Sequence, residues 1–127
     1  MSGGSGFVNI PGLSTTFAVP SQSVLYVETN GGVQTSSTSS PGYSAVDVAL
    51  FIDGSFAGTP AFRVIIAAPQ VTFPGIANWS FAVPSTLAPG THTIDVRARL
   101  EAGSTASVSG AFGDTRQGIL NVLVLKK

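Results

Sequence analysis

The last ten residues of the chain, GILNVLVLKK (118–127), form an almost unbroken apolar run. Successive side chains of a β-strand point to opposite faces, so a strand with one solvated face alternates apolar and polar residues. This segment instead carries apolar side chains on both faces, with Asn121 as the one polar interruption before the lysines. We therefore expect both faces of this strand to be covered.

A second segment, THTIDVRARLE (91–101), shows the ordinary pattern, and a third, AVDVALFID (45–53), resembles the C-terminal run. Segment 91–101 has Ile94, Val96, Ala98 and Leu100 on one face and Thr93, Asp95, Arg97 and Arg99 on the other. In segment 45–53, Asp47 is the only charged residue before Asp53 at the end of the strand, and it lies on the less apolar face. Antiparallel sheets commonly leave one face in solvent. Strands with two apolar faces therefore predict a second covering surface, for which we expect another subunit.

Short segments rich in β-branched and aromatic residues recur along the chain, and no long stretch has helical periodicity. Asp53-Gly54 is a hairpin signal, and the polar segment 30–44 is expected to be a long exposed loop. This pattern in 127 residues indicates one all-β sandwich or barrel over 6–127, after a flexible arm over 1–5. The predicted strands are 6–10, 13–19, 23–29, 45–53, 60–67, 78–83, 91–101, 104–109 and 117–126.

The composition and the length of the apolar runs exclude several function classes. Six basic residues balance six acidic ones, and no basic patch of the kind that binds nucleic acid is present. No apolar run approaches the roughly 20 residues of a membrane-spanning helix, and no secretory signal opens the chain. Charged residues are only 9% of the chain against 43% hydrophobic ones. We therefore expect uncharged polar residues, together with contacts between subunits, to cover much of the surface.

Four stretches together suggest a known class of fold. They are FVNIPGLSTTF (7–17), VALFIDGS (48–55), WSF (79–81) and LAPGTHTIDVRA (87–98), followed by the apolar terminal strand. In this order they resemble small bacterial and phage proteins of the C1q/tumour-necrosis-factor-like jelly-roll class. The resemblance implies an all-β, two-sheet antiparallel jelly-roll sandwich that forms a homotrimer. It also implies that the terminal strand packs near the threefold axis, with an interface formed by Leu120, Asn121, Val122, Leu123, Val124 and Leu125.

An immunoglobulin-type sandwich monomer is the structural alternative, because LAPGTHTIDVRA would also fit such a domain. The two readings differ in whether the terminal strand is covered by a neighbouring subunit or within its own chain.

The sequence offers little for catalysis. His92 is the single histidine, and Asp95, three residues further along the same strand, points to the opposite face, so a Ser-His-Asp arrangement is not expected. Asp47 and Asp53 lie at two ends of one strand, which does not suit a glycosidase pair. A small hydrolase is thus a remote alternative. We expect no cofactor and no metal site, although calcium on a threefold axis is conceivable.

Carbohydrate binding is the most credible ligand chemistry, because sugars are held by aromatic faces and bidentate polar groups. Some proteins of the resembled class bind fucosylated glycans between protomers, but their sugar-contacting residues do not match positions in this chain. Trp79 also fits a core position, on the same side of its strand as Phe81. The candidates are Tyr43, Arg63, Trp79, His92, Asp95, Arg97 and Arg99.

These observations lead to one expected function and one main alternative. The chain opens on methionine with no collagen-like or coiled-coil stalk, so a stand-alone trimer on a larger particle is expected rather than a fibre tip. The expected function is a non-enzymatic structural or attachment module, such as a phage capsid decoration protein, on a virion or extracellular surface. The alternative is a lectin that binds cell-surface glycans.

Overall fold

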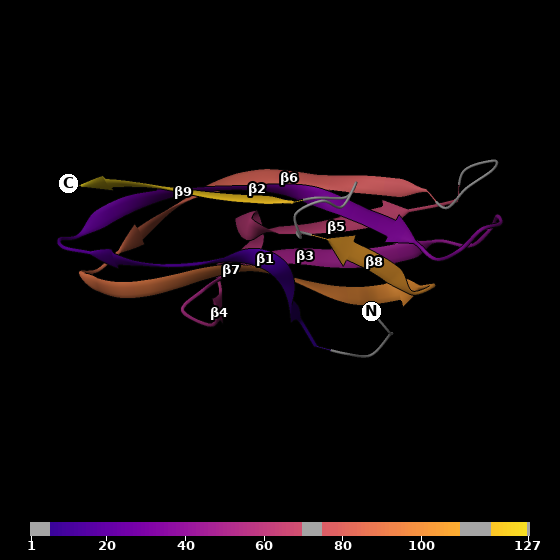
Figure 1. Ribbon diagram of the computed structural model, residues 1–127, viewed down its shortest axis with the longest axis horizontal. Coiled ribbons are helices and arrows are strands. Elements are labelled where there is room, and N and C mark those ends of the chain that lie inside the picture. The colour runs from indigo at the N-terminus through magenta and orange to yellow at the C-terminus, as the bar shows by residue number, and fades with distance from the viewer. Residues whose placement is uncertain (1–5, 70–74, 110–117, 127) are drawn as a thin grey trace.

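The chain folds into two antiparallel β-sheets packed face to face, as the sequence predicts (Figure 1). The computed structural model describes residues 6–69, 75–109 and 118–126. A single turn of 3-10 helix, η1 (Thr59–Ala61), interrupts the strands, and no helix in these ranges is long and apolar enough to span a membrane. The strands are β1 (Val8–Val19), β2 (Ser23–Thr35), β3 (Ser44–Ile52), β4 (Ser55–Phe56), β5 (Phe62–Ala67), β6 (Ile76–Leu87), β7 (Gly90–Gly103), β8 (Ala106–Ser109) and β9 (Ile119–Lys126).

Sheet A has the order β1-β7-β3, and β4 and β5 both pair with the far edge of β3. Sheet B has β2 at its centre, with β6 on one edge and β8 and β9 on the other. Figure 1 shows β6, β2 and β9 stacked over β1, β3 and β7. The chain crosses between the sheets repeatedly, so most neighbouring strands are far apart in sequence.

The core lies between the sheets and is built from one face of each strand. On β3 and β7 the paired residues Val46↔Leu100, Val48↔Ala98 and Leu50↔Val96 all point inward and are almost fully buried. Val27 and Trp79 belong to the same cluster from sheet B. The period-two alternation predicted for 91–101 is confirmed, because only one face of β7 joins this core.

The predicted break between the first two strands is wrong. Segments 6–10 and 13–19 were expected as separate strands, but β1 runs through Pro11-Gly12 as one strand with a register shift between Asn9 and Ser14. Gly12 has a φ of 81° at that shift, a conformation that glycine adopts at no steric cost. The proline-glycine pair therefore marks a bulge within the strand instead of its end.

The segment 30–44 is also not a long exposed loop. β2 continues to Thr35, and Val33 and Thr35 are buried. Gly31 in this stretch is explained by Trp79, which lies opposite it in the β2–β6 ladder. A Cβ atom on Gly31 would lie 2.1 Å from Trp79 Cη2, so only glycine leaves space for the indole ring.

The Asp53-Gly54 hairpin turn is confirmed. Both residues have positive φ, 51° and 81°, as a two-residue type I′ turn requires. The turn joins β3 to the very short β4 and places Phe56 directly opposite Phe51. It therefore folds an aromatic side chain over the end of β3.

The second apolar face of β3 is covered largely from within the chain. Ala49 and Phe51 are buried on the outer face of sheet A. The Phe51 ring packs against Phe7, with 5.3 Å between ring centroids, and the Arg97 guanidinium carbon lies 4.2 Å from its centroid. Another subunit is therefore not needed to cover Ala49 and Phe51 of β3.

Candidate functional site

The C-terminal strand β9 presents two different faces. It pairs antiparallel with β2 over its whole length, and Leu120, Val122 and Val124 are half-buried against the core. The alternate residues Ile119, Leu123 and Leu125 lie on the outer face of sheet B and are exposed. One of its two apolar faces is thus covered by the chain itself and the other is not.

The exposed residues of β9 form a continuous apolar surface with their neighbours on β2 and β6. Directly opposed residues in an antiparallel pair share a face, and the ladder places Tyr26 opposite both Leu123 and Pro84, and Val24 opposite Leu125. Tyr26 is 46% exposed, Leu123 56% and Leu125 52%. We call these five residues, Val24, Tyr26, Pro84, Leu123 and Leu125, the sheet B patch.

Polar residues border the sheet B patch on the same face. The next rung of the ladder pairs Glu28 with Asn121, and both are exposed. Asn121 therefore lies at the border of the apolar surface, opposite the Glu28 carboxylate. The sequence predicts this residue within the interface.

A groove runs between the edges of the two sheets, beside the same strand. It has a volume of about 460 Å³. Its apolar walls include Phe17 of β1 and the inward-facing side chains of β9, so β9 contributes both to the groove and to the sheet B patch. The residues that line it are Thr15, Phe17, Ala18, Pro20, Leu120, Asn121, Val122, Val124 and Lys126.

On the outer face of sheet A, two aspartates are buried and paired with arginines. Arg99 donates from Nη2 to Asp47 Oδ2 at 2.6 Å, and Arg97 Nε donates to Asp95 Oδ2. Arg99 also stacks on the Phe7 ring, with its guanidinium carbon 4.7 Å from the ring centroid. Because buried carboxylates need such partners, the two arginines are engaged in holding this face together.

The structure does not gather the sugar-binding candidates into one site. Trp79 is in the core, where Nε1–H donates to Thr29 Oγ1 at 3.1 Å. Arg63 Nη1 donates to the carbonyl oxygens of Pro60 and Phe62, and Tyr43 is exposed on the segment before β3. Among the seven, the contacts recorded in the described residues join only Asp95 to Arg97.

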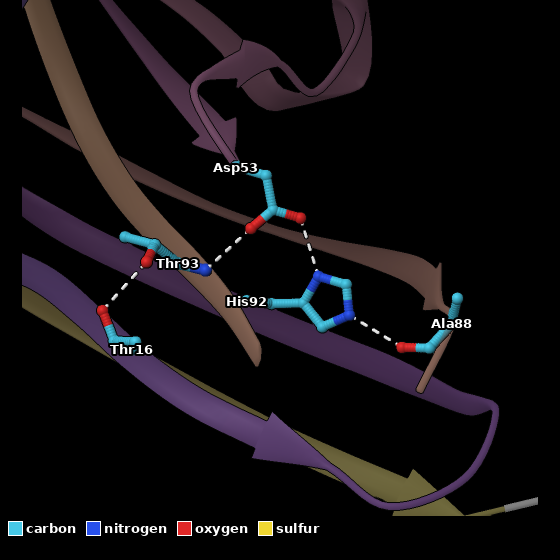
Figure 2. A network of polar contacts seen from close by, with 5 residues as sticks. All are labelled: Thr16, Asp53, Ala88, His92 and Thr93. Carbon is cyan, nitrogen blue, oxygen red and sulfur yellow. Dashed lines mark hydrogen bonds and ion pairs between the residues drawn. The ribbon is translucent and has the colours of Figure 1, made fainter. Parts of the chain in front are cut away.

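His92 has a partner that the sequence did not indicate. Its Nδ1 lies 2.7 Å from Asp53 Oδ2, and its Nε2 lies 2.7 Å from the carbonyl oxygen of Ala88 (Figure 2). The two residues are 39 positions apart, so only the β3–β7 register could have revealed the pair. An Asp-His pair can orient a catalytic base, but here Nε2 faces a carbonyl oxygen and not a hydroxyl nucleophile.

The described residues hold no group of three or more histidine, aspartate or glutamate side chains that could bind a metal ion. The sheet B patch is the candidate functional surface, because it gathers large exposed apolar side chains on one face of a sheet. No protein-family model matches the chain, and no curated protein was found to be similar to it.

Proposed function

We propose that this chain is a non-enzymatic structural or attachment module that assembles as a homotrimer through the sheet B patch. The observation that carries the proposal is the row formed by Tyr26, Leu123 and Leu125, three large apolar side chains side by side on the outer face of a sheet. Contiguous exposed apolar surface, bordered by polar residues such as Glu28 and Asn121, is typical of protein–protein contacts.

The edge of sheet B supports assembly as well. Strand β9 pairs only with β2 among the described strands, contains no proline, and carries its only charge at Lys126. Natural proteins protect such edges with charges, prolines or bulges, or cover them. A neighbouring subunit that covers the sheet B patch would also shield this edge.

The strand order supports a jelly-roll interpretation of the sandwich. The order β1-β7-β3-β5 in one sheet faces β6-β2-β9 in the other, and the chain crosses between the sheets after β1, β2, β5, β6 and β7. A jelly roll has eight strands in two sheets, built from two Greek keys. The two-sheet antiparallel sandwich formed by the described strands is compatible with that fold. The trimer and the attachment to a particle such as a phage capsid rest on the resemblance of the sequence to the C1q/tumour-necrosis-factor-like class.

Carbohydrate binding receives less support from the geometry. A lectin site needs an exposed aromatic face beside polar groups that are free to bind, whereas Trp79 is buried and Arg97 and Arg99 are paired with aspartates. A glycan array on the purified chain tests this alternative directly.

The experiment that tests the proposal is the solution mass of the purified chain, measured by light scattering during size-exclusion chromatography. The expected mass is three times that of the 12.9 kDa chain. Leu123→Asp is expected to give a folded monomer, because a charge in the sheet B patch would have to be desolvated on assembly. A mass of one chain for the wild type would overturn the proposal.

A matched control uses a residue of similar exposure on the other sheet. Ile66 on β5 is 62% exposed on the outer face of sheet A, so Ile66→Asp introduces the same charge away from the sheet B patch. It is expected to leave the trimer intact. Dissociation by both variants would show that added charge alone disrupts the assembly, and the assignment to sheet B would fail.

A further inference from the structure

The ring of His92 is held between two oxygen atoms of different segments. Asp53 in the β3–β4 turn approaches Nδ1 and Ala88, in the connection from β6 to β7, approaches Nε2, both at 2.7 Å. Figure 2 shows the ring bridging the two. The His92 side chain is 13% exposed, whereas the side chain of its partner Asp53 is 47% exposed.

Both partners of the ring are hydrogen-bond acceptors. A carboxylate oxygen and a backbone carbonyl oxygen cannot donate, so each contact needs an N–H on the ring. A neutral imidazole has one N–H and the imidazolium has two. The observed arrangement therefore fits the protonated ring alone.

The charges near the ring favour the protonated form. In the described part of the chain, Asp53 is the one charged side chain in contact with it, while the neighbouring elements present Phe17 of β1, directly opposite in the ladder, and the backbone of Ala88. The hydrogen bond to Asp53 raises the pKa of His92 above its ordinary value, and the hydrogen bond to the Ala88 carbonyl adds to this.

The two contacts of the ring are not equally replaceable. Asp53 is also fixed by Thr93, whose N–H donates to Oδ1 at 2.9 Å, and its own N–H donates to the Thr93 carbonyl oxygen. A neutral ring would keep its single N–H on the charged carboxylate, the stronger acceptor. Its Nε2 lone pair would then face the lone pairs of the Ala88 carbonyl, and that contact would break.

We propose that His92 is a proton-operated latch that holds the connection from β6 to β7, residues 88–89, against the β3–β4 turn. The imidazolium closes the latch through both ring nitrogens. Loss of one proton releases the Ala88 side while Asp53 stays bound to Thr93. The released segment is next to the start of β7, where Thr91 and His92 lie directly opposite the groove residues Ala18 and Phe17 in the β1–β7 ladder.

The latch is testable by NMR because His92 is the only histidine. Its ring signals report its titration without ambiguity. The amide exchange of Ala88 and of residues 90–92, corrected for intrinsic rates, reports release. Protection is expected to fall by about fivefold as the ring loses its proton, which corresponds to the loss of one hydrogen bond. Unchanged protection across the titration would overturn the proposal.

Two variants separate the latch from a general effect of charge. Asp53→Asn removes the carboxylate and is expected to shift the His92 titration to lower pH and to abolish most of the change in protection. Glu101→Gln removes an exposed carboxylate further along β7 and is expected to leave both unchanged. A His92 titration that is the same in Asp53→Asn as in the wild type would show that the pair does not operate the latch.

Discussion

Leu123 of β9 lies directly opposite Tyr26 of β2, and both side chains are about half exposed on the outer face of sheet B. Their chain neighbours Val122 and Val27 lie on the opposite face and pack in the core or against it. A single pair of strands thus carries an internal apolar face and an external one. The external face is the surface from which we infer assembly.

The two faces of β9 predict different consequences for the same kind of substitution. Val124→Asp places an unpaired charge at a half-buried position against the core and is expected to lower the free energy of unfolding by about 2 kcal/mol, because partial desolvation of that charge is costly. Leu123→Asp is expected to change the free energy of unfolding by less than about 0.5 kcal/mol when the variant and the wild type are compared as monomers at low protein concentration. Urea denaturation measures both values, and similar losses for the two variants would contradict the assignment of faces.

The buried Asp47–Arg99 pair predicts a loss of stability when one partner is removed. Asp47→Asn leaves the Arg99 guanidinium without its carboxylate, but Arg99 is 37% exposed and can recover hydration. We therefore expect a loss of about 2 kcal/mol in urea denaturation, below the usual cost for a fully buried pair.

The matched substitution is Glu101→Gln, which breaks the longer and more exposed contact of Arg99 with Glu101 at 3.4 Å. A change within about 0.5 kcal/mol is expected there, as for exposed ion pairs in general. Equal effects of the two substitutions would mean that burial of Asp47 does not determine the strength of its pairing.

Gly31 predicts a packing defect that fluorescence can detect. In Gly31→Ala the added methyl group would meet the Trp79 ring at 2.1 Å, so the indole must move and the core must rearrange. A loss of about 1–3 kcal/mol is expected, with a red shift in emission from this single tryptophan. Gly6→Ala, which has nothing within 4 Å of the added atom, is the control and should change neither quantity.

The His92–Asp53 pair predicts a stability maximum between two titrations. Hydrogen bonds to Asp53 and to the Ala88 carbonyl raise the pKa of His92 above 6.5. The contribution of His92 to the free energy of unfolding is therefore fully present below pH 6.5 and is lost as pH rises through the pKa of the folded state. The hydrogen bond from His92 lowers the pKa of Asp53 below 3.8. The contribution of Asp53 to the free energy of unfolding is therefore present above pH 3.8 and is lost as pH falls through the pKa of the folded state.

Thermal unfolding at stepwise pH measures this profile. The melting temperature of the wild type is expected to decline above neutral pH, while Asp53→Asn should flatten the decline. A wild-type profile that stays level while His92 titrates by NMR would contradict the linkage.

Local features of the sequence determined a large part of the fold. The alternation over 91–101 depends only on the two-residue period of a strand, and the Asp53-Gly54 turn depends on the ability of these two residues to adopt positive φ. The apolar character of β9 on both faces was also visible, as was the placement of Trp79 on the side of its strand that points into the core.

The tertiary structure decided what lies beside each segment. β1 continues through Pro11-Gly12 because β7 supplies a partner on both sides of the bulge, and 30–35 is a strand because β6 and β8 pair with it. The cover of Phe51 by Phe7 and the contact between His92 and Asp53 likewise join residues more than 35 positions apart. Such contacts follow from sheet register and from the crossings between sheets, which no local pattern of residues encodes.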